Sequence, residues 1–87
     1  MTFHVVVQSE ARRMVMNKLP VGVAGAVISF LEAELAENPR RVGKALRAPR
    51  LGQWSARRGE YRIIYTIDDS AQLVRVLRID HRRDIYR

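Results

Sequence analysis

Cysteine is absent from this chain of 87 residues. Its absence excludes disulfide bonds, catalysis by a thiolate and zinc sites with cysteine ligands. Histidine is scarce too, since the chain has only His4 and His81, with few carboxylates near either one. Metal sites in proteins draw mainly on these residue types, so we expect neither a metal ion nor a cofactor.

Long hydrophobic runs are also missing. The most apolar stretch is interrupted by Glu32 and Glu34, so it falls short of the ~20 apolar residues that a membrane-spanning helix needs. Residues 1–7 lack the basic segment and the long apolar segment of a secretory signal. We therefore expect a cytoplasmic protein that folds as a single domain over residues 1–87.

Lysine is rare although the chain is strongly basic. Sixteen basic and nine acidic residues give a net charge of +7, yet only Lys18 and Lys44 are lysines. The planar guanidinium group of arginine makes bidentate contacts with phosphate or carboxylate groups, which favours a binding role for the excess arginine. A GC-rich genome would also replace lysine by arginine, so the ratio alone leaves both explanations open.

The positive charge is concentrated in the second half of the chain. Eight basic residues lie from Arg40 to Arg62 against the single acid Glu60, and five lie from Arg75 to Arg87 against two acids. A cationic half beside a nearly neutral one is typical of a polyanion-binding surface, although a solvated basic surface is the alternative. The candidate RNA-binding residues are Lys44, Arg47, Arg57, Arg58 and Arg83.

The hydrophobic pattern of the first half predicts one strand and two helices. A β-branched run from Phe3 to Gln8 predicts the strand. Apolar residues at helical spacing predict a helix from Ser9, expected to be its cap, to Leu19, and a second helix from Pro20 to Asn38. The expected apolar stripe of the second helix consists of Ala24, Val27, Ile28, Leu31 and Leu35.

The second half predicts a loop over residues 40–52 and then three strands. These strands are Gln53 to Arg58, Tyr61 to Ile67 and Leu73 to Ile79. In the last of them, alternation places Ile79 on the face opposite Val74 and Val76. The chain is therefore expected to be an α+β domain of order β-α-α-β-β-β, with an antiparallel sheet packed against a helical hairpin.

The sequence lacks the signatures of most hydrolases and nucleotide-binding enzymes. No serine lies in a G-x-S-x-G motif, and Gly22 and Gly25 lie in a predicted helix rather than in a phosphate-binding loop. The adjacent acids Asp68 and Asp69 are typical of a turn. The remaining candidates are arginines, a histidine and a tyrosine near the ends of the last two strands.

Cleavage of RNA without a metal ion would suit these candidates. The reaction deprotonates a 2′-hydroxyl, stabilises the charge that develops on the phosphorane and protonates the leaving 5′-oxygen. Arginine can stabilise that charge, and His81 or Tyr86 could transfer protons. The structural alternatives are an ion pair with a nearby acid for Arg62, a surface position for His81, and packing over the sheet edge for Tyr86.

Three segments resemble motifs of the RelE/ParE toxin superfamily. Residues 55–65 (SARRGEYRIIY) resemble its R-x-G-x-Y-R core, and residues 79–87 (IDHRRDIYR) resemble its C-terminal I-x-H-R-R-D-[VI]-Y ending. Asn38-Pro39 followed by residues 43–47 resembles its linker. The predicted element order agrees across nearly the whole chain. The resemblance implies the toxin of a type II toxin–antitoxin pair.

The two branches of this superfamily imply different activities. Toxins of the RelE branch cleave mRNA on the ribosome by in-line attack of the 2′-hydroxyl, and an acidic RelB-like antitoxin holds them inactive; operator DNA is bound only through the antitoxin complex. Toxins of the ParE branch inhibit DNA gyrase. The C-terminal ending is more similar to the RelE branch, which implies a ribosome-dependent endoribonuclease. A third possibility is a catalytically silent member that acts only in DNA-bound autoregulation.

The resemblance also implies roles for individual residues. Arg62 and Arg82 match arginines that stabilise the scissile phosphate and the transition state. Tyr86 matches a late tyrosine that stacks on a base or transfers a proton, and His81 lies where the family has a lysine or a histidine. The candidate catalytic residues are thus Arg62, His81, Arg82 and Tyr86.

One feature departs from the family pattern. Some RelE enzymes carry two lysines on the strand before the core motif, and this chain has Gln53 and Ser55 there. Neither side chain is a proton-transfer group, and arginine is a poor base because it stays protonated. The general base must then be another residue, such as His81, or the intrinsic rate must be lower.

Overall fold

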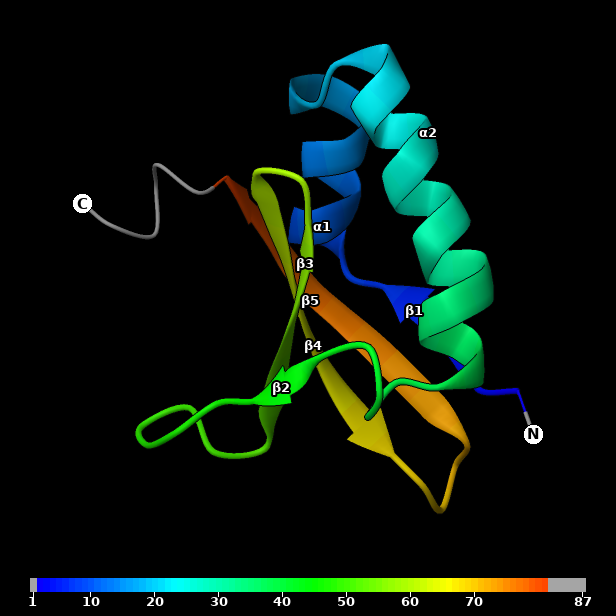
Figure 1. Ribbon diagram of the computed structural model, residues 1–87, viewed down its shortest axis with the longest axis vertical. Helices are drawn as coiled ribbons and strands as arrows, with labels where there is room; N and C mark the ends of the chain where they lie inside the picture. The colour runs from blue at the N-terminus through cyan, green and yellow to red at the C-terminus, as the bar shows by residue number, and fades with distance from the viewer. Residues whose placement is uncertain (1, 82–87) are drawn as a thin grey trace.

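Two helices pack against one face of a mixed β-sheet in the computed structural model, which describes residues 2–81 (Figure 1). The helical elements are α1 (Ser9–Arg13) with its π-helical continuation Met14–Lys18, and α2 (Val21–Phe30) with its π-helical continuation Leu31–Leu35. The strands are β1 (His4–Val7), β2 (Lys44–Ala45), β3 (Gln53–Arg58), β4 (Tyr61–Asp68) and β5 (Leu73–His81). No helix within this range is long and apolar enough to cross a membrane.

The sheet has the strand order β1-β5-β4-β3-β2. The pairs from β5 to β2 are antiparallel, as expected, but β1 runs parallel to β5. The predicted α+β class is therefore confirmed, but the prediction of a purely antiparallel sheet was wrong, because the sheet is mixed. Parallel strands need a long crossover, and the segment between β1 and β5, which includes both helices, provides it. The short strand β2 lies within the segment that was expected to be a loop.

The helix boundaries differ slightly from the prediction. The cap of α1 is Gln8 instead of Ser9, because the Gln8 N–H still donates to the Val76 carbonyl (2.9 Å) and extends the strand ladder. Pro20 is likewise the extended residue before α2 and not its first helical residue. On α2, Val27 is buried as expected, but Ile28 is 42% exposed.

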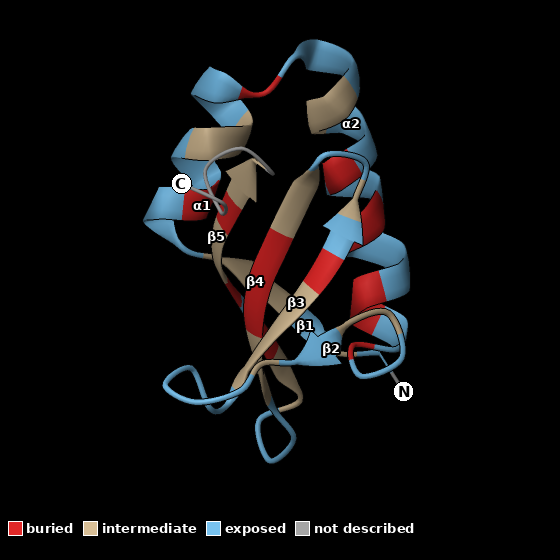
Figure 2. Cartoon of the chain, turned by 60° about the vertical axis from the view of Figure 1, so that its left-hand side comes forward, coloured by how far each residue is buried: buried red, intermediate tan, exposed pale blue. Residues whose placement is uncertain are grey.

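The face of α2 that packs on the sheet contains Phe30, which the predicted apolar stripe omitted. Phe30, which is 3% exposed, lies three residues after Val27 and so belongs to the same helical face. Leu31 and Leu35 extend that face. Figure 2 shows buried segments at intervals along the second helix and a longer buried segment in β4.

A β-bulge in β5 changes which side chains face the helices. Ile64 pairs with Arg78 and Tyr65 pairs with Val76, so Leu77 has no partner on β4. Strict alternation fails at this point, and Ile79 is buried on the same side as Val76. The predicted two faces of this strand were therefore wrong beyond Leu77, and Arg78 lies on the face away from the helices.

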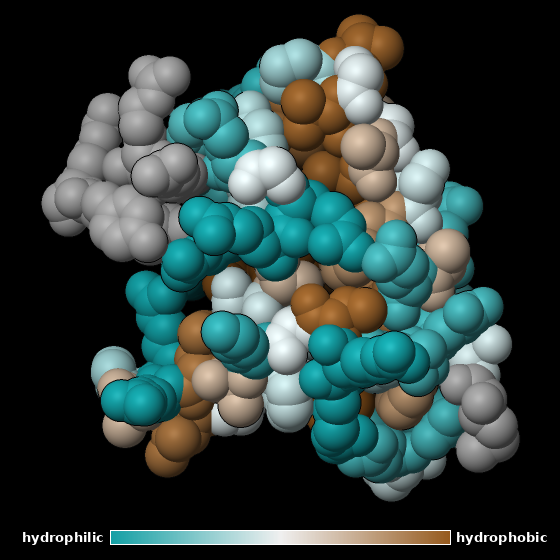
Figure 3. Space-filling model, in the orientation of Figure 1, coloured by the Kyte–Doolittle hydropathy of each residue, from teal (hydrophilic) through white to brown (hydrophobic). Residues whose placement is uncertain are grey.

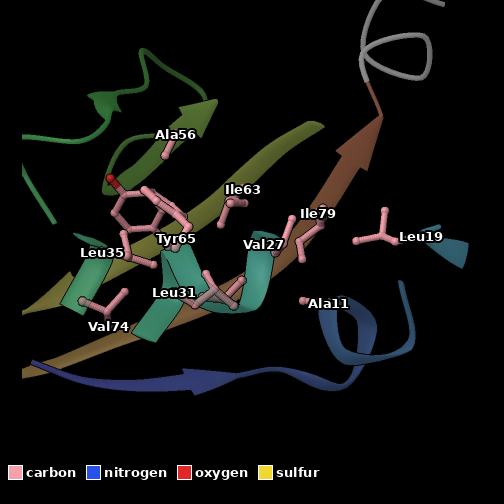
Figure 4. Close-up of a cluster of buried hydrophobic side chains, with 12 residues drawn as sticks. Ala11, Leu19, Val27, Leu31, Leu35, Ala56, Ile63, Tyr65, Val74 and Ile79 are labelled. Carbon is pink, nitrogen blue, oxygen red and sulfur yellow. The ribbon is translucent and has the colours of Figure 1, made fainter. Parts of the chain in front are cut away.

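The core fills the space between the helices and the sheet (Figure 4). Its largest fully buried side chain is Tyr65 of β4. The Tyr65 hydroxyl donates a hydrogen bond to the Pro39 carbonyl (2.6 Å), which ties the segment after α2 to the sheet. The other buried members are Ala11, Leu19, Val27, Phe30, Leu31, Leu35, Ala56, Ile63, Val74, Val76 and Ile79.

Candidate nucleic-acid interface

On the face of the sheet opposite the helices, two cross-strand rows lie next to the Gly59-Glu60 turn. Ala56, Ile63 and Ile79 are buried toward the helices, so their neighbours along each strand point the other way. The strand register then defines a first row of Arg57, Arg62 and Asp80 and a second row of Ser55, Ile64 and Arg78. We call this surface the open face. Lys44 of β2 pairs with Ser55 and extends the second row.

Arg57 and Arg62 lie directly opposite each other on β3 and β4. Like charges in opposed positions destabilise a sheet. The register that pairs them is set by the two-residue turn Gly59-Glu60, where Gly59 has φ of +60°, a conformation that glycine adopts without strain. Asp80 lies opposite Arg62 in the same row, and two guanidinium groups side by side on one face can contact the same phosphate, so the pair is a candidate anion site.

A hollow of about 390 Å³ lies beside this arginine pair. Its lining includes Lys44, Arg57 and Arg62 together with Arg41 from the preceding loop, and no acidic side chain within residues 2–81 lines it. In Figure 3, hydrophilic residues gather over β2 and β3, while hydrophobic residues gather over the start of α2. The complete lining is Arg41, Val42, Gly43, Lys44, Leu46, Ser55, Arg57 and Arg62.

Buried Tyr65 positions the loop that carries Arg41 and Lys44. Besides the bond from its hydroxyl to Pro39, the hydroxyl lies so close to Gly43 that a Cβ atom there would collide with it. The same Cβ would come within 2.9 Å of the Ser55 carbonyl oxygen. Burial raises the pKa of Tyr65 to about 12, so the hydroxyl keeps its proton and its bond even above pH 10, where an exposed tyrosine would ionise.

Arg58 does not belong to the open face. It lies one residue beyond Arg57 and therefore points toward the helices, where its guanidinium group stacks at 3.7 Å over the Phe30 ring. Its Nη2 atom donates to the Glu34 carboxylate at 2.5 Å. The structure thus places Arg58, a candidate RNA-binding residue, in a contact between β3 and α2.

His81 is also separated from Arg62. It pairs with Tyr61 in the register, one position beyond the row of Arg62 and Asp80, and so projects toward the helical side. Its ring meets the Tyr61 ring edge-on with 4.9 Å between centroids, and its Nε2 atom lies 3.5 Å from the Glu60 carboxylate. The structure therefore does not bring this candidate proton-transfer residue to the arginine pair.

The remaining candidates from the sequence, Arg47 and the C-terminal residues, do not line the hollow or lie outside the described residues. Arg47 is exposed in the loop between β2 and β3, outside the hollow. Arg82, Arg83 and Tyr86 lie outside the described residues, directly after β5. Their proposed roles remain predictions.

Sequence reasoning missed three residues at this surface. Arg41 lines the hollow, although only its place in a basic run could have indicated it. Arg78 and Asp80 reach the open face because of the bulge at Leu77, which no sequence signal marks. The Arg78 Nε atom donates to Asp80 Oδ2 at 2.8 Å.

Two residues of β3, Gln53 and Ser55, stand where the family pattern has lysines. They alternate with inward-facing residues such as buried Ala56, so they project onto the same side as Arg57. The Gln53 side-chain oxygen is buried and has no hydrogen-bond partner within the part of the chain that the structure describes. Lys44, paired with Ser55, is the nearest amine in the register. In residues 2–81, no three acidic or histidine side chains are grouped so as to hold a metal ion.

Comparisons with known proteins are consistent with this arrangement. A family model described as the ParE toxin of type II toxin–antitoxin systems matches residues 16–86. The chain is 50% identical over 72 residues to Toxin RelG of Mycobacterium tuberculosis, covering 83% of each protein. It is 40% identical over 85 residues to Toxin RelE of the same organism, covering 98% of this chain and 87% of that protein.

Solved structures show the same fold. A chain of the toxin–antitoxin complex RelBE2 from M. tuberculosis aligns with a TM-score of 0.89 and 44% identity, over 94% of this chain and 100% of that one. A chain of the Escherichia coli RelBE complex aligns with a TM-score of 0.75 and 22% identity, over 91% of this chain and 95% of that one.

Proposed function

Because the chain belongs to the ParE toxin family of type II toxin–antitoxin systems, we propose that it arrests growth as a ribosome-dependent endoribonuclease that cleaves mRNA without a metal ion. The observation that carries the proposal is the opposed pair Arg57 and Arg62, beside a hollow lined by further cations. The relatives at 40% and 50% identity carry RelE-type names, which favours the RNA-cleaving branch.

The arginine pair suits the charge that develops during RNA cleavage. When the 2′-oxygen attacks phosphorus, the phosphorane gains negative charge on its non-bridging oxygens. Arg62 and Arg57 donate hydrogen bonds to these oxygens from fixed positions on two paired strands, so little reorganisation is needed as the charge grows. The O2′–P bond forms and the P–O5′ bond breaks, which leaves a 2′,3′-cyclic phosphate and a 5′-hydroxyl.

The rest of the catalytic set is assigned by family resemblance. Arg82 and Tyr86 follow β5 directly, and we propose that they complete the site as a second phosphate contact and as a base-stacking or proton-transfer group. Lys44 and Arg47 bind the RNA backbone on the β2 side. His81 can serve in proton transfer only around the end of β5, since its ring lies against Tyr61.

A RelB-like antitoxin is the proposed regulatory partner. The related RelBE2 structure is a toxin–antitoxin complex. This chain carries exposed apolar side chains on its helices, with Met16 75%, Val21 92% and Ile28 42% exposed. A small acidic protein could cover these side chains with a helix and pair its carboxylates with the arginines of the open face. Both proteins would act in the cytoplasm.

The test compares Arg62→Ala with Arg12→Ala, which removes the same charge from an exposed position on α1 at the helical side. Each variant is induced without antitoxin at equal expression, and transcripts are mapped by primer extension. We expect cuts within coding regions for the wild type and Arg12→Ala. For Arg62→Ala we expect the cleavage rate to fall by roughly 100-fold or more. Equal cleavage by all three proteins would refute the site assignment.

Inhibition of DNA gyrase is the second candidate, because the matching family model is described as a ParE toxin and the two family lysines are absent. This function predicts that induction triggers the DNA damage response before translation stops. Binding to RNA would then show little dependence on salt between low and moderate concentrations, since few phosphates would be contacted. The order of the two cellular responses separates the candidates.

A further inference from the structure

Arg78 and Asp80 form an ion pair on the open face that the proposed reaction does not use. They lie two residues apart on β5 and share a face, beyond the bulge at Leu77. The Arg78 Nε atom is 2.8 Å from Asp80 Oδ2, and the side chains are 28% and 26% exposed. The pair is therefore partly shielded from water yet still accessible from the open face.

The contact leaves the outer edge of the Arg78 guanidinium group available. Only Nε bonds to Asp80, and neither terminal nitrogen makes a hydrogen bond to another residue in the range 2–81. A guanidinium group held through Nε keeps its plane fixed while its terminal N–H groups remain free to bind an oxyanion. A one-point ion pair of this kind contributes little to stability on its own, so its value for folding is small.

We propose that Arg78 binds a phosphate of the RNA next to the scissile one, and that Asp80 is the positioning residue that orients its guanidinium group. This inference rests on the proposed endoribonuclease function. Asp80 lies directly opposite Arg62, and Arg78 lies in the neighbouring row with Ile64. Side chains two residues apart on one face of a strand are separated by roughly 6.6 Å, so an RNA strand across the open face would place different phosphates near Arg62 and Arg78.

The position of Arg78 determines which kinetic parameter it controls. A phosphate that does not react carries the same charge in the ground state and in the transition state. Contact with it therefore contributes uniform binding, which lowers the toxin concentration needed for half-maximal cleavage and leaves the maximal rate unchanged. Arg62, in contrast, controls the rate of the chemical step.

Substitutions of Asp80 distinguish an orienting role from a purely electrostatic one by the direction in which RNA binding changes. By electrostatics alone, removal of a carboxylate from a phosphate-binding face should strengthen RNA binding. If Asp80 orients Arg78, its removal should weaken binding instead, and only while Arg78 is present. Asparagine retains an oxygen that can accept the Arg78 Nε–H bond but carries no charge, so Asp80→Asn should bind RNA at least as tightly as the wild type does.

The experiment measures single-turnover cleavage of mRNA on purified, programmed ribosomes over a range of toxin concentrations. The variants are Arg78→Ala, Asp80→Ala, Asp80→Asn and the double variant, with Arg12→Ala as the charge-matched control; circular dichroism confirms that each is folded. We expect Arg78→Ala to raise the half-maximal concentration about tenfold with an unchanged maximal rate. We expect Asp80→Ala to raise it about threefold in the wild-type background and not at all beside Arg78→Ala.

Four results would overturn the inference while leaving the proposed function intact. The first is an Arg78→Ala protein that cleaves as Arg12→Ala does, and the second is an Asp80→Ala protein that binds RNA more tightly than the wild type. The third is an Asp80→Asn protein with a reduced maximal rate and an altered pH profile, which would assign Asp80 to proton transfer. The fourth is weaker inhibition of Arg78→Ala by the antitoxin with normal cleavage, which would assign Arg78 to the protein partner. A wild-type toxin that cleaves no mRNA would instead refute the proposed function.

Discussion

Replacement of Tyr65 by phenylalanine removes a single oxygen atom from the centre of the domain. The side chain is fully buried, and its hydroxyl donates to the Pro39 carbonyl at 2.6 Å. Without the hydroxyl, that carbonyl loses its partner in a buried position, which costs about 1 to 3 kcal/mol of unfolding free energy at pH 7. The segment between α2 and β2, which carries Arg41, also loses its tie to the sheet, so toxicity should fall.

The pH dependence of this effect has a defined sign. Burial raises the pKa of Tyr65 from 10.0 to about 12, so the folded state favours the neutral phenol. The stabilisation is complete below pH 10 and is lost as the pH rises through the folded-state pKa. One unit of pKa difference corresponds to about 1.4 kcal/mol, so the advantage of the wild type over Tyr65→Phe should shrink by roughly 1.4 kcal/mol at pH 11.

Urea unfolding of both proteins at pH 8 and at pH 11 measures this difference directly. Other groups that titrate in this range are common to the two proteins and cancel in the comparison. We expect Tyr65→Phe to be the less stable protein at pH 8 and to lose less stability at pH 11. An unfolding free-energy difference that stays constant between the two pH values would refute the burial of a protonated phenol at this position.

Three further predictions follow from particular contacts. Gly43→Ala should lower the unfolding free energy by about 1 to 3 kcal/mol in urea unfolding, because the added Cβ collides with the Tyr65 hydroxyl. Arg57→Ala should reduce the slope of log affinity against log salt by about 0.7 in RNA-binding titrations, which corresponds to one lost phosphate contact. The hydrogen bonds from Arg40 lower the pKa of Asp69, so the stabilisation that they give is lost as the pH falls through that lowered pKa. In urea unfolding at decreasing pH, the unfolding free energy of Asp69→Asn should therefore fall less than that of the wild type.

The predictable parts of the fold are those that follow from local patterns. Apolar residues at helical spacing identified the helix that buries Val27, and the Gly59-Glu60 turn identified the hairpin that pairs Arg57 with Arg62. Ile28 was misplaced because periodicity alone does not show where an apolar face ends. The parallel pairing of β1 with β5 depends on tertiary contacts between segments distant in the chain, so no local pattern indicates it.

The candidate site was predicted only as far as strand alternation holds. Arg62 lies on the open face because β4 alternates regularly up to Ile64. Beyond the bulge at Leu77, alternation in β5 changes phase, so Arg78 moves away from the helices. Position in a basic run likewise did not distinguish Arg57 from Arg58, because the facing direction of each side chain decides whether it lies on the open face or contacts Glu34.

Whether the open face cleaves mRNA is tested most directly by a map of transcript ends after brief induction. Primer extension on cells that express the wild-type chain without antitoxin should reveal new 5′ ends within coding regions, which disappear in Arg62→Ala and persist in Arg12→Ala. Growth arrest with intact transcripts and an early DNA damage response would contradict mRNA cleavage and assign the toxin to a protein target.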